Sequence, residues 1–84
     1  MLPNTIPSLA VQYRQNAARL HRCVEALSRW EEWHCAQAMT AALRPAVARP
    51  PLSQPALVEL AQMLTNRLVE LDTALREALA GRRN

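Results

Sequence analysis

The chain contains stretches in which apolar residues recur with the period of an α-helix, and proline-containing segments separate these stretches. Residues 9–43 contain neither glycine nor proline, and large apolar residues recur there every three or four positions. This period places them on one face of an α-helix. The first part of the stripe consists of Leu9, Tyr13, Ala17, Leu20, Val24 and Leu27. We therefore predict a first helical segment over residues 8–43, with Ser8 as its N-cap, after an N-terminal arm of residues 1–7.

Beyond Leu27 the apolar stripe moves to a different position around the helix. The next apolar residues are Trp30, Trp33, Ala36, Met39 and Leu43. Ser28 and Glu31 also match a capping box. Two interpretations remain open, one long helix whose buried face rotates or two helices with a break near Ser28. We favour the continuous helix, because no residue in the segment forces it to stop.

The second half of the chain predicts a stiff connection and one more helix. Residues 44–54 contain three prolines and are expected to be extended, because the residue before a proline avoids the α conformation. A helix over residues 55–80 follows, with Ser53 or Gln54 as its N-cap, Pro55 in its first turn and Gly81 at its end. Residues 81–84 form a tail. The stripe of this helix is Leu57, Leu60, Leu64, Leu68, Leu71, Leu75 and Leu79, and it is widened by Val58, Met63 and Val69.

These elements predict a single all-α domain over residues 1–84. Two long segments joined by a stiff loop should pack as an antiparallel helical hairpin, with a third helix if the first one breaks. Two helices leave part of each apolar stripe uncovered. We therefore expect a homodimer or a helical partner to complete a bundle.

Composition narrows the possible functions. Alanine and leucine make up 28 of the 84 residues, and the single glycine excludes a glycine-rich phosphate loop. All ten basic residues are arginine, the formal net charge is +3, and acidic residues are interleaved with the arginines. Abundant arginine and alanine indicate a GC-rich, bacterial genome. The N-terminus lacks a basic signal-peptide region and no apolar run could span a membrane, so we expect a soluble, cytoplasmic protein.

No catalytic or metal site is predicted. Two histidines and two cysteines have the composition of a zinc site: His21, Cys23, His34 and Cys35. On a continuous helix, however, Cys23 and Cys35 lie about 18 Å apart, too far for one zinc ion or an intrachain disulfide. The neighbouring carboxylates of Glu31 and Glu32 diverge by about 100° and cannot act as a pair on one bond. We therefore predict no cofactor and no enzymatic activity.

Trp30 and Trp33 are the most unusual local feature, because they share one helix face and the only other aromatic residue is Tyr13. They are either core anchors or a binding hot spot, since tryptophan is enriched where interfaces concentrate their energy. The candidate partner-binding residues are Trp30, Trp33, Met39, Leu64, Leu68 and Leu71.

The segment from Ala26 to Trp33, in which apolar residues precede tryptophans and glutamates, resembles part of the small all-α chaperones and co-chaperones of bacterial flagellar and type III secretion systems. The long final helix from Leu57 to Leu79 extends the resemblance. It implies a protein that holds an export substrate or partner subunit in an apolar groove.

Two functions therefore compete. The first is a non-enzymatic helical interaction module, in the form of a secretion chaperone that holds a helical partner. The alternative is a small nucleic-acid-binding regulator or replication accessory protein that uses its arginines. Arg14, Arg19, Arg22 and Arg29 lie on the first helix, but glutamates follow them closely and no stacking aromatic residues lie among them. These features favour the interaction module.

Overall fold

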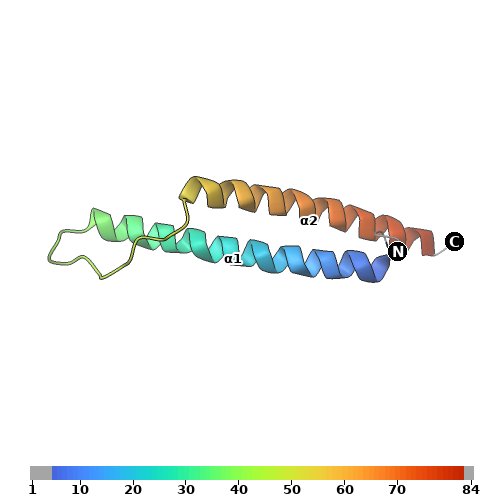
Figure 1. The fold of residues 1–84 in the computed structure, drawn as a ribbon, viewed down its shortest axis with the longest axis horizontal. Coiled ribbons are helices and arrows are strands. Elements are labelled where there is room, and N and C mark those ends of the chain that lie inside the picture. Colours follow the sequence, from blue (N-terminus) through green and yellow to red (C-terminus); the bar gives the residue numbers. More distant parts are fainter. Residues whose placement is uncertain (1–4, 83–84) are drawn as a thin grey trace.

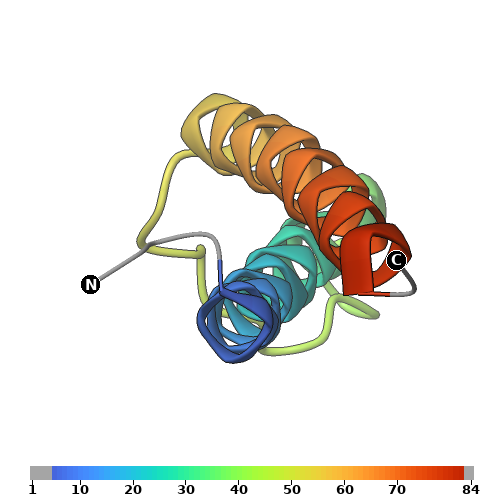
Figure 2. The same cartoon turned by 90° about the vertical axis from the view of Figure 1, so that its right-hand side faces the viewer.

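The computed structural model describes residues 5–82, which form two α-helices and one loop. Helix α1 spans Ile6–Ala38 and α2 spans Gln54–Arg82. They lie side by side and antiparallel, so the start of α1 and the end of α2 are at the same end of the molecule (Figure 1). The end-on view shows that the two helix axes are inclined to each other (Figure 2). The predicted all-α helical hairpin is confirmed.

Helix α1 begins two residues before the predicted segment, because its N-cap is Thr5, three residues before Ser8. The Thr5 backbone is extended, its side-chain oxygen accepts a hydrogen bond from the Ser8 N–H at 3.4 Å, and its carbonyl accepts from Leu9 at 2.9 Å. Pro7 lies in the first turn, where its missing N–H costs nothing. The predicted arm is therefore partly helical, and its residues 1–4 lie outside the described residues.

Helix α1 continues without a break through Ser28, which confirms the favoured interpretation. The Ser28 hydroxyl donates to the Val24 carbonyl one turn earlier, at 3.1 Å. A serine that bonds back in this way lies in a helix interior. Since the backbone is helical on both sides, the sequence match to a capping box does not mark a helix start here.

The far end of α1 comes five residues earlier than predicted, at Ala38. Met39 is extended, and the Arg44 guanidinium folds back to donate to the carbonyls of Ala36, Gln37 and Met39 at 3.1, 3.4 and 3.2 Å. The last carbonyls of a helix lack partners within it, and a cation is favourable there. Arg44 therefore supplies the cap that the sequence pattern did not predict.

Helix α2 starts as predicted and ends later than predicted. The Ser53 carbonyl accepts from the Leu57 N–H at 3.0 Å and its hydroxyl from the Ala56 N–H at 3.5 Å, with Pro55 in the first turn. Gly81 was expected to end the helix by adopting a left-handed conformation. Its φ is not positive, so the helix continues to Arg82. Residues 83–84 of the predicted tail lie outside the described residues.

The last turns of α1 extend past the start of α2, and the loop folds back along them. Figure 1 shows the loop, residues 39–53, returning beside α1 before α2 begins. His34 and Gln54 join the two helices across this return, with the Nε2 and Oε1 atoms 3.0 Å apart. The loop thus covers a part of α1 that α2 does not reach.

The buried core is small for a chain of this length. Its members are spread along the seam between the helices and under the loop: Leu9, Cys23, Trp30, Ala36, Leu57, Leu64 and Leu71. The radius of gyration is 18.8 Å, whereas a compact domain of this length has about 12 Å. Two helices alone therefore give an extended molecule of 67 × 21 × 17 Å with little interior.

Candidate interaction surface

The apolar stripe of α1 points only partly at α2. Leu9, Cys23 and Trp30 are buried, whereas Tyr13 and Val24, both in the predicted stripe, are exposed. With 3.6 residues per turn, Val24 lies about 100° around the helix from Cys23. The stripe is therefore turned to one side of the seam instead of facing α2 directly.

Helix α2 presents apolar residues on the same side of the seam. A shallow groove of about 410 Å³ is lined by Leu27, Val58, Ala61, Gln62, Thr65 and Asn66. Val69 follows Val58 by eleven residues, which is about three helical turns, so both lie on this side of α2. Val58 and Val69 are exposed. The two helices together form one surface around the groove.

We call this surface the uncharged face. It comprises Tyr13, Ala17, Leu20, Val24 and Leu27 of α1 with Val58, Ala61, Thr65 and Val69 of α2. From Tyr13 to Leu27 it extends about 21 Å along α1 at 1.5 Å per residue. Leu20, Leu27 and Ala61 are half-buried, so the surface is partly ordered by the hairpin.

Paired charges lie at the margins of the uncharged face. His21 Nε2 and Glu25 Oε1 are 3.0 Å apart along the outer edge of α1. Arg76 Nε and Asp72 Oδ2 are 3.0 Å apart beyond Val69, one turn from each other on α2. Such a pattern, apolar in the centre and polar around it, is typical of a protein–protein interface.

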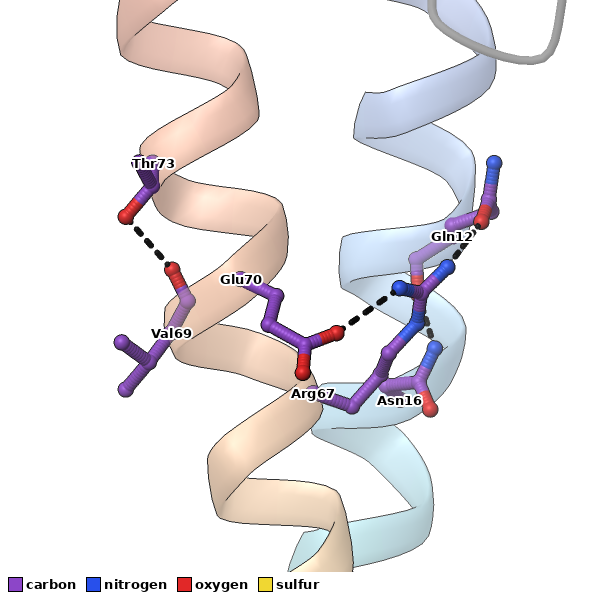
Figure 3. Close-up of polar contacts among 6 residues, drawn as sticks. All are labelled: Gln12, Asn16, Arg67, Val69, Glu70 and Thr73. Atoms are coloured by element: carbon purple, nitrogen blue, oxygen red, sulfur yellow. Dashed lines mark hydrogen bonds and ion pairs between the residues drawn. The ribbon is translucent and has the colours of Figure 1, made fainter.

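The seam between the helices contains polar side chains. Figure 3 shows Arg67 Nη2 donating to the Gln12 side-chain oxygen at 3.1 Å, while Arg67 Nη1 pairs with Glu70 at 3.1 Å. Asn16 Nδ2 donates to the Gln12 carbonyl at 2.7 Å. Gln12 and Asn16 are half-buried. These contacts satisfy polar groups but add little apolar burial between α1 and α2.

The two tryptophans hold the loop against α1. Their rings lie edge to face with centroids 5.7 Å apart, and the Arg49 guanidinium lies 5.8 Å from the Trp30 ring and 5.7 Å from the Trp33 ring. The Trp30 N–H donates to the Leu52 carbonyl at 2.7 Å. Trp30 also belongs to the core cluster with Cys23 and is only 7% exposed. Trp30 is thus an internal anchor, and Trp33 is half-buried beside it.

The opposite side of the seam is basic. One groove there, of about 300 Å³, is lined by Arg19, Arg22, Cys23, Ala26, Leu52, Leu57 and Leu60. Another, of about 400 Å³, lies between Arg19 on α1 and Met63 and Arg67 on α2. The two sides of the hairpin therefore differ in chemistry, one uncharged and one carrying arginines.

The six predicted partner-binding residues fall in three places. Leu64 and Leu71 are buried in the seam, with Leu68 half-buried on the same face of α2. Trp30 and Trp33 lie under the loop. Met39 is exposed at the end of α1. The structure therefore brings these residues together in two separate clusters and leaves Met39 apart from both.

The residues of the uncharged face were missing from the predicted set, although the sequence contained their signal. Val58 and Val69 lie beside the leucine stripe instead of within it, and they widen it on one side. Tyr13 and Val24 were placed in the apolar stripe of the first helix because their spacing fits one helix face. Spacing defines a face but does not say which neighbour covers it.

Within residues 5–82, no three histidine, cysteine or acidic side chains gather as metal ligands would. Cys23 is buried and its Sγ donates to the Leu57 carbonyl at 3.4 Å, while Cys35 is exposed. Neither of the two described helices has a stretch that is apolar enough to cross a lipid bilayer.

Compared with known protein families, with curated proteins and with solved structures, the chain matches none of them.

Proposed function

We propose that the chain is a non-enzymatic helical interaction module that holds a helical partner against the uncharged face. The observation that supports this proposal is that Val24 of α1 and Val58 and Val69 of α2 are exposed on one side of a two-helix hairpin. Apolar surface gains about 25 cal/mol per Å² when it is removed from water. A third and a fourth helix placed on this side would complete a bundle.

The resemblance to bacterial secretion chaperones and co-chaperones gives the proposal its finer form. In that form the partner is an export substrate or a subunit of a secretion apparatus, and the complex forms in the cytoplasm. The uncharged face would keep the apolar face of the partner helix from aggregating before export.

Site-specific photo-crosslinking in the native host tests the proposal. A benzoylphenylalanine replaces Val69 on the uncharged face or Met63 on the basic side, which are matched in exposure at 62% and 67%. We expect the probe at position 69 to yield one discrete crosslinked protein, identified by mass spectrometry, and the probe at position 63 to yield none. Equal crosslinking from both positions, or none from either, would contradict the proposal.

A second candidate is nucleic-acid binding. It is favoured by four exposed arginines of α1, Arg14, Arg19, Arg22 and Arg29, which form no ion pair with a carboxylate among the described residues. Binding through phosphates weakens steeply with salt. Fluorescence anisotropy with single- and double-stranded oligonucleotides between 50 and 200 mM salt, on the order used for such slopes, tests it. No binding at the lowest salt would remove this candidate.

A further inference from the structure

We propose that the occupant of the uncharged face is a second copy of this chain, so that two hairpins pack face to face as a four-helix bundle. This inference rests on the proposed function, because it names the partner of the same surface. Three observations support it: the area that the chain leaves exposed, the distribution of its charges and the shape of the groove.

The chain exposes more surface than a standard dimer interface requires from each partner. The chain exposes 6574 Å², whereas a compact monomer of 9.4 kDa exposes about 5,000 Å². A standard interface buries about 800 Å² on each partner. Covering the uncharged face with a second hairpin would therefore bring each chain closer to the exposure of a compact protein.

The charges favour a copy of the chain over a charged partner. Each chain carries a formal net charge of +3, so two copies repel each other if their arginines meet. Arg19 and Arg22 line the groove on the other side of the seam, and face-to-face packing would leave them directed outward. At the margins, the Asp72–Arg76 pair combines opposite charges, and the carboxylate of Glu25 contacts the imidazole of His21. Two uncharged faces can therefore meet without opposing like charges.

The shape of the groove suits helices that cross at a small angle. Small side chains, Ala61 and Thr65, lie along the groove, and the larger Leu27 and Val58 line it as well. Side-chain ridges of one helix pack into such grooves of another at about 20° in four-helix bundles. In a two-fold dimer, the proposed packing would place the ridges of each hairpin over the groove of the other.

Light scattering of the purified chain, with a pair of matched valine variants, tests the inference. Val24 and Val11 are both on α1 and both 50% exposed, but they lie about 140° apart around the helix. We expect the wild-type chain at micromolar concentration to have about twice its monomer mass of 9.4 kDa. Val24→Glu should reduce the mass to that of the monomer, and Val11→Glu should leave it doubled.

Two further measurements keep the result interpretable. Far-UV circular dichroism must show that Val24→Glu is still helical, and Val69→Glu repeats the test from α2. A wild-type monomer, or a dimer that Val11→Glu disrupts as fully as Val24→Glu, would overturn the inference. Crosslinking from position 69 to a different protein would overturn it too and would leave the proposed function intact. Crosslinking equally from positions 69 and 63 would instead contradict the proposed function.

Discussion

The side chain of Trp30 joins α1 to both the loop and the start of α2. It belongs to α1, its indole N–H bonds to the loop at Leu52, and it clusters with Leu57 at the start of α2. Arg49 covers the ring from the loop side. A single buried tryptophan in a molecule with so small a core carries a large share of the total stability.

We predict that Trp30→Ala lowers the free energy of unfolding by about 3–5 kcal/mol, because it removes a buried aromatic side chain and leaves a cavity. Trp30→Phe keeps most of the ring but leaves the Leu52 carbonyl without its donor, so a loss of about 1–2 kcal/mol is expected. Urea denaturation at one fixed protein concentration measures both. Trp33→Phe is the control, because Trp33 is half-buried and its indole N–H has no hydrogen-bond partner within residues 5–82. An equal loss from Trp33→Phe and Trp30→Phe would contradict this assignment.

For Asn16 we predict a substitution that raises the free energy of unfolding instead of lowering it. Asn16 is half-buried, lines a groove with Leu60 and Leu64, and donates to the Gln12 carbonyl of its own helix. We expect Asn16→Leu to raise the free energy of unfolding by about 1 kcal/mol, because each buried methylene contributes about 0.8 kcal/mol. A shift of the urea midpoint to higher concentration is the expected result. A lower midpoint would mean that the polar contact stabilises the seam more than apolar packing does.

At the scale of elements, the sequence predicted both helices, the loop between them and the continuity of α1 through Ser28. Apolar spacing and the prolines account for that success, because both act locally. The ends of α1 were wrong for reasons that local patterns do not contain. Thr5 and Ser8 both belong to the residue types that cap helices, and Arg44 caps the last turn from outside the helix.

The candidate surface was harder to predict than the helices. Leu64 and Leu71 follow the same spacing as exposed Leu60 and Leu79 in one stripe, and only the rotation of α2 against α1 decides which are covered. Polar Gln12 and Asn16 occupy part of the α1 seam, which displaces Tyr13 and Val24 to the side. A stripe can be recognised from sequence, but its neighbour depends on tertiary packing.

The N-cap of α1 gives a prediction at the scale of one helix end. We expect Thr5→Ala to lower the free energy of unfolding by about 1 kcal/mol, because it removes the oxygen that accepts from the Ser8 N–H. Ser8→Ala removes only the acceptor of the Gln12 side chain and should cost less than about 0.5 kcal/mol. Urea denaturation of both variants measures the difference. A larger loss for Ser8→Ala would place the cap at Ser8 after all.

At the scale of the whole molecule, the proposed association would link stability to protein concentration. If two hairpins share the uncharged face, folding and dimer formation are linked, and the thermal midpoint rises with protein concentration. We therefore expect the midpoint of the wild-type chain to increase by several degrees over a hundredfold concentration range, on the order given by mass action. Val24→Glu should abolish this dependence, and Val11→Glu should retain it. Circular dichroism at 222 nm measures all three.

The position of the tryptophans also determines which part of this protein their fluorescence monitors. Both indoles lie where the loop returns along α1, and none lies near the end of the hairpin where α1 starts and α2 stops. Their emission therefore follows the docking of the loop, with Arg49 beside both rings as a nearby charge. Helical circular dichroism instead averages over residues 6–38 and 54–82. A mismatch between the two signals during unfolding would show that the loop end and the terminal end of the hairpin open separately.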